Sequence, residues 1–250
     1  MNWKEKFPKE NRYFETDNGI LYCGDCLEIL PKFPEMEIDL VLTDPPYGIN
    51  FNSNVPKKGR EKELIKNDDS IDTLLKLFNE SLKNLTRILK DDAEIYWFCS
   101  AGGRVSPYAY LAIELEKYYP IFKHKNLLVW DKLSPGFGWD WRYQHELIIQ
   151  IVKGKGIKNT DSGASNIIRA KKVIPQMDEH PTPKSTNVIN QILIRKPSDV
   201  VLDMFLGSGT TAFCCEKSNR KWIGIEIEPK YCEMAKKRIE SEAKQLKLNL

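Results

Sequence analysis

The sequence contains no run of about 18 apolar residues, the length that a membrane-spanning helix needs. Its amino-terminal segment, Met1 to Lys9, is charged and aromatic and so differs from a secretory signal sequence. No internal repeat is visible along the chain. These absences argue against a membrane or secreted protein, and we expect a soluble, cytoplasmic one.

The cysteines lack the pattern of a disulfide framework or a zinc site. They are Cys23, Cys26, Cys99, Cys214, Cys215 and Cys232. Most fall in expected strands or helices, where a free thiol packs as a small apolar side chain. Cys23 and Cys26 have redox-like or zinc-like spacing, but no second close Cys or His pair accompanies them. We therefore expect reduced thiols, no disulfide and no metal.

The composition fits one folded unit. With 250 residues, of which 41% are hydrophobic and 10% aromatic, the chain can bury a full core. It fits a single α/β domain over residues 1–250 with an insertion better than two independent domains. Strand-like and helix-like segments alternate, which favours a doubly wound, mostly parallel sheet covered by helices on both faces.

Apolar runs and helical periodicity give the expected elements. Strands are expected at 20–23, 38–42, 93–99, 126–130, 146–152, 200–202 and 222–225. Helices are expected at 27–30, from a cap at Asp69 or Ser70 to Leu89, and at 107–117, 186–193, 210–217 and 229–245. Two polar segments lack periodicity. We expect residues 52–69 to form a mobile loop and residues 153–178 to form an insertion.

Basic residues are concentrated in these two polar segments, although the net charge of the chain is only +3. One cluster contains Lys57, Lys58 and Arg60. The other contains Lys153, Lys155, Lys158, Arg169, Lys171 and Lys172; between Lys153 and Lys172 the only acid is Asp161, so residues 153–172 carry +5. Taken alone, such runs are equally compatible with solvated loops.

A glycine turn follows the expected strand at 200–202. Gly207 and Gly209 lack a Cβ atom, which permits a tight turn and close approach of a ligand. Ser208, Thr210 and Thr211 add hydroxyl groups and open a helix whose positive end attracts a negative group. The third glycine of a dinucleotide fingerprint is missing. A carboxylate ligand is therefore as compatible with this turn as a phosphate.

An acid stands at the end of the strand after this turn. Glu226 lies 23 residues beyond Asp203. Nucleotide-binding α/β folds place an acid at about this distance to bind the two ribose hydroxyls. The glycine turn alone could be an ordinary tight turn, but together with Glu226 it favours a nucleotide-like ligand.

A second functional segment, Thr43-Asp44-Pro45-Pro46-Tyr47, follows the expected strand at 38–42. Proline restricts both its own φ and the residue before it, so Asp44 and Pro45 are held extended. The Asp44 carboxylate and the Pro45 carbonyl then form two adjacent acceptors suited to an NH₂ group. Tyr47 offers a flat ring on which a base can stack. By itself, the segment is equally compatible with a plain turn.

The two segments in this order resemble those of the permuted group of S-adenosylmethionine-dependent amino-methyltransferases of DNA, in which D-P-P-Y precedes F-x-G-x-G. Four further stretches carry the resemblance: Tyr22-Cys23-Gly24-Asp25-Cys26-Leu27, Trp130-Asp131-Lys132, Tyr143-Gln144-His145-Glu146 and His180-Pro181-Thr182-Pro183-Lys184. The resemblance covers nearly the whole chain and implies a Rossmann-like methyltransferase fold.

The resemblance also implies roles for individual residues. Residues expected to line the S-adenosylmethionine pocket are Asp203, Phe205, Gly207, Ser208, Gly209, Thr210 and Thr211. Glu226 is expected to bind the ribose, and Asp25 to face the adenine amino group of the cofactor. Thr182 and Lys184 are expected to contact the methionine carboxylate. Asp44, Pro45, Pro46 and Tyr47 are expected to form the catalytic segment.

The implied activity is site-specific methylation of adenine N6 in double-stranded DNA, by base flipping and direct in-line attack. In this family an Asp before Pro-Pro-Tyr goes more often with adenine N6, and a Ser there with cytosine N4. The basic clusters are expected to contact DNA, with residues 153–178 as a small target-recognition insertion. Cytosine N4 methylation and an inactive nucleic-acid-binding protein of the same fold remain alternatives. A homodimer and a cognate restriction endonuclease are further partners that the resemblance allows.

Overall fold

The computed structural model describes residues 2–48, 68–102, 106–136, 140–160, 163–172 and 184–248. The strands in these ranges form one sheet in the order β1-β2-β9-β8-β3-β4-β6-β5-β7. Their bounds are β1 (Arg12–Glu15), β2 (Gly19–Cys23), β3 (Ile38–Thr43), β4 (Leu89–Cys99), β5 (Phe122–Asp131), β6 (His145–Lys153), β7 (Ile167–Arg169), β8 (Val200–Asp203) and β9 (Lys221–Glu226).

Six α-helices and three short 3₁₀ helices occur in the described ranges. The α-helices are α1 (Cys26–Ile29), α2 (Ile71–Ile88), α3 (Pro107–Leu115), α4 (Thr186–Arg195), α5 (Thr210–Lys217) and α6 (Pro229–Leu248). The 3₁₀ helices are η1 (Trp3–Lys6), η2 (Leu30–Lys32) and η3 (Glu116–Tyr118). Ser70, one of the two expected caps, accepts a hydrogen bond from the backbone N–H of Thr73 at the start of α2.

The sheet is mostly parallel, as predicted. Among the described strands, only β1 and β6 run against the other seven. All seven expected strands are present, but β4 and β5 each start four residues earlier than expected, at Leu89 and Phe122. Strands β1 and β7 were not predicted, because strands of four and three residues are too short to show a periodic pattern.

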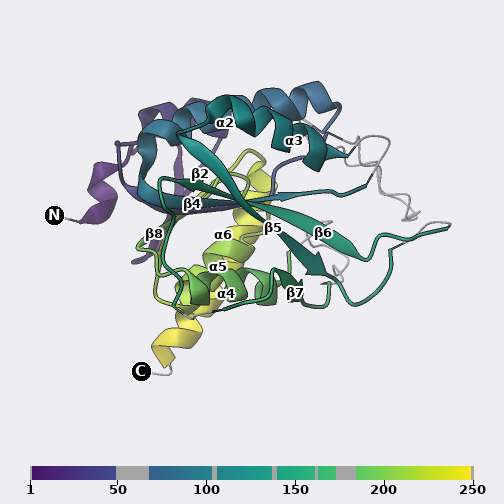
Figure 1. Ribbon diagram of the computed structural model, residues 1–250. Coiled ribbons are helices and arrows are strands. Elements are labelled where there is room, and N and C mark those ends of the chain that lie inside the picture. The colour runs from purple at the N-terminus through teal and green to yellow at the C-terminus, as the bar shows by residue number, and fades with distance from the viewer. Residues whose placement is uncertain are drawn as a thin grey trace.

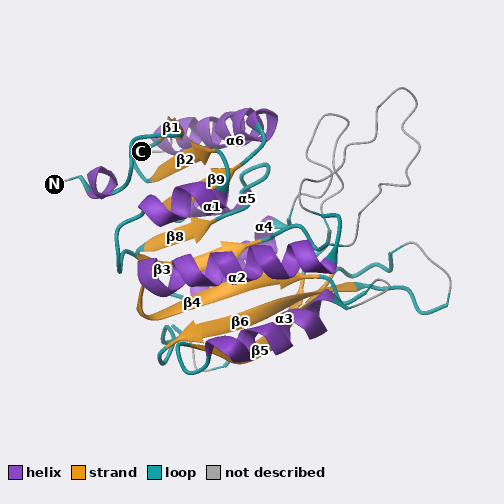
Figure 2. Cartoon of the chain, turned by 90° about the horizontal axis from the view of Figure 1, so that it is seen from above, coloured by secondary structure: helices purple, strands orange, loops and turns teal. Residues whose placement is uncertain are grey.

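Helices cover both faces of the sheet (Figures 1 and 2). One face packs against α1, α2 and α3, and its core includes Phe78, Trp97 and Leu111. The other packs against α4, α5 and α6, and its core includes Trp130, Ile189 and Trp222. The doubly wound fold is therefore confirmed. The apolar residues at three- and four-residue steps along α2 all face the sheet because that spacing repeats on one side of a helix.

The chain progresses across the sheet in opposite directions from β3 and from its neighbour β8. From β3 the chain passes through α2 to β4 on one side, whereas from β8 it passes through α5 to β9 on the other. Ligands of doubly wound sheets bind at the carboxyl ends of the strands at such a reversal. We call this edge of the sheet, where β3 and β8 end, the reaction edge.

The segment expected as an insertion is divided by the fold. Residues 145–153 form β6, which runs away from the reaction edge because it pairs antiparallel with β4. Residues 154–160 therefore lie near the opposite edge, where Thr160 bonds to Arg195 at the end of α4. Strand β7 then returns parallel to β5 and ends at the reaction edge. Of the expected loop at 52–69, residues 52–67 lie outside the described residues.

All six cysteines are free thiols, as predicted, and five of them are buried. None of the helices in the described part of the chain is long and apolar enough to cross a membrane. The fold thus depends on its apolar core rather than on covalent links.

Candidate active site

The two functional segments meet because β3 and β8 are neighbouring parallel strands. Leu40 and Val41 pair with Val201 and Leu202, so both strands end at the same level. The Thr43 hydroxyl then donates a hydrogen bond to Asp203 Oδ1 at 3.2 Å and accepts one from the Met204 N–H at 3.2 Å. We call the segment from Asp44 to Tyr47 the reaction segment. These two bonds fix its start against the start of the glycine turn.

Asp203 is a buried carboxylate between the two segments. Its Oδ1 also accepts a hydrogen bond from the Phe205 N–H at 3.1 Å. Burial raises the pKa of Asp203 to about 7, and hydrogen bonds from Thr211, Phe205 and Thr43 only partly oppose that rise. Asp203 therefore titrates within the physiological range.

The glycine turn has the backbone geometry that the sequence predicts, but for a partly different reason. Gly207 and Gly209 have φ angles of 53° and 82°, in the left-handed region. A Cβ atom on Gly209 would lie 3.0 Å from the Cβ of Ala235 in α6. Close packing of α6 thus requires a glycine here independently of any ligand. Helix α5 begins directly after it, at Thr210.

Glu226 organises the same turn from the end of β9. Its Oε2 accepts a hydrogen bond from the Gly207 N–H at 2.8 Å, and its Oε1 accepts one from the Glu228 N–H at 2.8 Å. Burial raises the pKa of Glu226, while these N–H groups lower it. The Glu226 carboxylate is therefore held in one orientation beside Gly207 of the glycine turn.

Asp25 lies beside Glu226 at the reaction edge. Strand β2 pairs with β9 so that Cys23 is opposite Glu226, and Asp25 follows two residues later. Asp25 Oδ1 accepts a hydrogen bond from the Leu27 N–H at 2.8 Å and so caps α1. The ends of β2, β9 and β8 thus bring acidic acceptors and the glycine turn together, as the sequence predicts.

In the reaction segment, both oxygens of Asp44 have partners. The Tyr47 hydroxyl donates to Asp44 Oδ1 at 2.6 Å. Lys184 Nζ lies 3.0 Å from Asp44 Oδ2 and donates to the Tyr47 hydroxyl at 3.0 Å. Pro45 and Pro46 connect Asp44 to Tyr47 and restrict the backbone between them. The segment is therefore a closed, hydrogen-bonded unit rather than an open turn.

Glu146, at the start of β6, completes this cluster. Lys184 Nζ donates to Glu146 Oε2 at 2.8 Å, and Lys132 Nζ lies 3.6 Å from Glu146 Oε1. Burial raises the pKa of Asp44, and the Lys184 ammonium opposes that rise. Burial lowers the pKa of Lys184, but Asp44 and Glu146 outweigh it, so the net pKa is raised. Lys184 is therefore firmly protonated.

Sequence reasoning missed Glu146 and gave Lys184 a different role. Lys184 was expected at the methionine carboxylate, whereas the structure places its ammonium on Asp44, Tyr47 and Glu146. The available signal was a charged residue at the start of the largely apolar run 146–152. A buried carboxylate in such a position needs a partner, but sequence spacing does not say which lysine supplies it.

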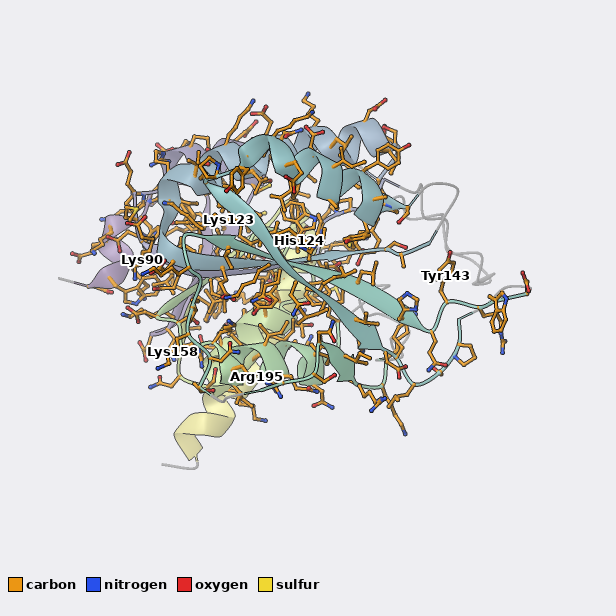
Figure 3. The ribbon with its side chains drawn as sticks, in the orientation of Figure 1. Lys90, Lys123, His124, Tyr143, Lys158 and Arg195 are labelled. Atoms are coloured by element: carbon orange, nitrogen blue, oxygen red, sulfur yellow. The ribbon has the colours of Figure 1, made fainter. Side chains whose placement is uncertain are left out.

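The basic residues of the expected insertion do not lie together. Arg169 is the last residue of β7 and pairs with Asp131. Arg169, Lys171 and Lys172 therefore lie at the reaction edge. Lys153 ends β6 at the other edge, where its Nζ donates to the Leu89 carbonyl at 2.7 Å. Figure 3 shows Lys158 and Lys90 at one end of the sheet and Tyr143, just before β6, toward the other. The structure thus places Lys153, Lys155 and Lys158 toward the edge of the sheet opposite the reaction edge, because β6 runs antiparallel to β4, and this separates them from Arg169, Lys171 and Lys172.

Four other expected residues lie outside the described part of the chain: Lys57, Lys58, Arg60 and Thr182. Of the remaining cofactor residues, Ser208 is half-buried in the glycine turn. Phe205 packs edge-on against Trp97, with ring centroids 6.4 Å apart. The Thr210 hydroxyl accepts a hydrogen bond from Arg238 at 3.0 Å.

A family model described as DNA methylase matches residues 38–237, which include both functional segments. The chain belongs to this DNA methylase family. It is 30% identical to the DNA adenine methyltransferase YhdJ of Escherichia coli (strain K12), over 91% of this chain and 84% of that protein. It is 27% identical to the type II methyltransferase M2.LlaDCHI of Lactococcus lactis subsp. cremoris, over 92% and 93%.

Solved structures agree with this assignment. The cytosine-N4-specific PvuII DNA methyltransferase has a TM-score of 0.73 with 19% identity, over 95% of this chain and 95% of that one. M1.HpyAVI, solved as a complex with SAM, has a TM-score of 0.64 with 25% identity, over 88% of this chain and 98% of that one. The protein is therefore a DNA methyltransferase that uses S-adenosylmethionine (SAM) as its methyl donor.

Proposed function

We propose that this enzyme methylates adenine N6 at a specific site in double-stranded DNA. The observation that carries the proposal is the Asp44 carboxylate, fixed at the end of β3 and linked through Thr43 and Asp203 to the glycine turn. An ionised carboxylate accepts hydrogen bonds and donates none, so it suits a target that is an amino group. The name of the relative YhdJ supports adenine as the target base.

The residues around the glycine turn fit SAM. Glu226 and Asp25 offer carboxylate oxygens for ribose hydroxyls and an adenine amino group, and both lie at neighbouring strand ends. The start of α5 offers N–H groups for a carboxylate. SAM supplies an electrophilic methyl group when it is bound there. No side chain of the protein then needs to act as a nucleophile.

Asp44 and the Pro45 carbonyl are proposed to accept hydrogen bonds from the target NH₂ group. The lone pair of an exocyclic amine is delocalised into the ring, so the amine is a weak nucleophile. Two acceptors draw charge onto the nitrogen and hold it in one orientation, and fixed geometry of this kind accounts for large rate factors. Asp44 is also proposed to take the proton that the amine loses.

The target base must leave the duplex to reach this segment. Extruding a nucleotide costs about a few kcal/mol. Stacking on the Tyr47 ring would offset about 1–3 kcal/mol of that cost. The ring is held in place by the hydrogen bond from its hydroxyl to Asp44.

Arg169, Lys171 and Lys172 are proposed to bind phosphates beside the reaction edge. Assembly into a homodimer and pairing with a cognate restriction endonuclease stay predictions from the sequence.

Nucleoside analysis distinguishes the two target bases. DNA from a methylation-free host that expresses the gene is digested and its nucleosides are separated by mass spectrometry. We expect N6-methyladenine, and mapping of methylated positions in the same DNA gives the recognition sequence. N4-methylcytosine alone would instead support the cytosine alternative, which the fold of the PvuII enzyme keeps open.

The variant Asp44→Ala tests the role of the reaction segment. We expect it to abolish transfer of radiolabelled methyl groups to unmethylated DNA and to keep SAM binding, because Asp44 is assigned to the base. Wild-type protein that binds DNA and SAM but transfers no methyl group would support the inactive alternative. An Asp44→Ala enzyme with normal activity would exclude the mechanism.

A further inference from the structure

A cluster of charged side chains from three separate parts of the chain surrounds the reaction segment. Asp44 follows β3, Glu146 is the second residue of β6, and Lys184 lies just before α4. Lys184 Nζ is 3.0 Å from Asp44 Oδ2 and 2.8 Å from Glu146 Oε2. The Lys184 side chain is 11% exposed and that of Glu146 is 19% exposed. One ammonium therefore serves two carboxylates in a largely dry site.

We propose that Lys184 and Glu146 are positioning residues for methyl transfer: Lys184 keeps the Asp44 carboxylate ionised and oriented, and Glu146 moderates that effect by sharing the same ammonium. The inference rests on the proposed function, since it assigns Asp44 to the target amine. Neither residue needs to touch the base or SAM for this role.

The geometry explains why orientation depends on Lys184. The two oxygens of Asp44 are held separately, Oδ1 by the Tyr47 hydroxyl and Oδ2 by Lys184. A carboxylate with only one fixed oxygen can rotate about its χ2 bond, which is a broad torsion. A misplacement of about 1 Å can cost about 100-fold in rate. Loss of Lys184 should therefore lower kcat even where Asp44 remains ionised.

The electrostatics explain why ionisation depends on both residues. Burial raises the pKa of Asp44, Lys184 lowers it, and the like charge of Glu146 raises it. Removal of the ammonium should thus raise the pKa of Asp44, and removal of the Glu146 charge should lower it. The other titratable or charged groups near this cluster are Tyr47, Cys99, Lys132, Lys172 and Asp203.

Opposite effects of two neighbouring substitutions separate this role from a merely structural one. A general loss of packing would lower activity in both variants without shifting their pH profiles in opposite directions. The role also differs from the one expected from sequence, in which Lys184 binds the methionine carboxylate. That role predicts weaker SAM binding in a Lys184 variant, whereas the positioning role predicts a shifted pH profile.

The chain offers a matched control at the opposite edge of the sheet. Lys196 Nζ donates to Glu94 Oε1 at 2.9 Å, and both side chains are buried. Breaking this pair leaves Glu94 with a more distant ammonium, that of Lys125 at 3.5 Å, as breaking the Lys184 pair leaves Glu146 with that of Lys132 at 3.6 Å. Glu94 is paired with Leu40 near the start of β3, whereas Asp44 follows the end of that strand. Lys196→Met should therefore cost stability without moving the pH profile.

The experiment compares Lys184→Met, Lys184→Arg, Glu146→Gln and Lys196→Met with the wild type. The methyl-transfer rate at saturating SAM is measured against pH, with unmethylated genomic DNA as substrate. SAM affinity is measured by calorimetry. The pKa of the Asp44 carboxyl is measured by ¹³C NMR, with Asp44→Asn used to assign its signal. This NMR titration of Asp44 does not depend on methyl-transfer activity.

We expect Lys184→Met to move the acid limb of the rate profile and the Asp44 titration up by about 1–3 pH units. Glu146→Gln should move both down, and Lys184→Arg should keep both near the wild-type position. SAM affinity should stay within about twofold in Lys184→Met, a difference well below the tenfold that 1.4 kcal/mol would produce.

Unchanged Asp44 titration in Lys184→Met, a shift of the same size in Lys196→Met, or a tenfold loss of SAM affinity in Lys184→Met would each overturn the inference. Wild-type protein that transfers no methyl group to DNA would instead overturn the proposed function. In that case the Asp44 titration in the four variants still decides whether Lys184 controls its ionisation.

Discussion

Asp203 is the residue where stability and function conflict most clearly. A carboxylate whose folded pKa is raised to about 7 binds a proton in the folded state at pH values where the unfolded chain, near pKa 3.8, has lost it. The stability that this proton contributes is present at low pH and is lost as the pH rises from about 4 to about 7. At neutral pH, Asp203 therefore costs stability.

The substitution Asp203→Asn should remove this cost. We expect the free energy of unfolding at pH 8 to rise by about 1–4 kcal/mol relative to wild type, because each unit of pKa shift corresponds to about 1.4 kcal/mol. The gain should shrink as the pH falls toward 4. Urea unfolding at several pH values measures it. Asp199→Asn is the matched control, since Asp199 is an exposed partner of Lys221. A gain that does not vary with pH would contradict the assignment.

Residue roles that depend on strand ends could be predicted from the sequence, and roles that depend on tertiary contacts could not. Asp44 and Glu226 each follow an apolar run, so their place at one sheet edge follows from the alternation of strands and helices. Lys184 meets Glu146 only because β6 and the start of α4 converge in space. No spacing rule connects residues 38 positions apart on different elements.

At the scale of elements, the packing of α5 against α6 fixes the glycine turn. Gly209→Ala combines a left-handed φ of 82° with a Cβ atom 3.0 Å from that of Ala235. We expect a loss of about 2–4 kcal/mol in the free energy of unfolding, measured by urea denaturation. Gly163→Ala is the control, since nothing lies within 4 Å of the added atom. Equal costs in both variants would show that the helix contact does not matter.

The division of the basic segment by β6 and β7 makes a second prediction at this scale. Lys171→Ala/Lys172→Ala should weaken binding to duplex DNA and make its salt dependence shallower by about 1–2 in the slope of log affinity against log salt. Lys155→Ala/Lys158→Ala removes the same charge from the opposite edge and should change neither. All four side chains are exposed. Fluorescence anisotropy at several salt concentrations measures both pairs, and equal effects would contradict the placement of DNA at the reaction edge.

For the whole molecule, the doubly wound fold could be predicted because each half of the chain repeats strand, helix and strand. The direction of β6 in the sheet could not be predicted. An apolar run such as 146–152 is equally compatible with either direction, and only the pairing of β6 with β4 and β5 makes it antiparallel. Because β6 is antiparallel, Lys153, Lys155 and Lys158 lie toward the far edge of the sheet and Glu146 lies near the reaction segment.

The arrangement of the whole site predicts that SAM binding and base binding are separable. Glu226 organises the turn after β8, whereas Asp44 belongs to the segment after β3. A ligand at 100 times its Kd stabilises the folded state by about 2.7 kcal/mol, which in a chain of this size raises Tm by roughly 5–10 °C. Asp44→Ala should keep this rise in a thermal melt with SAM, and Glu226→Ala should lose it at the same SAM concentration. If Asp44→Ala also lost the rise, the two strand ends would have to form one indivisible site, and the assignment of Asp44 to the base alone would fail.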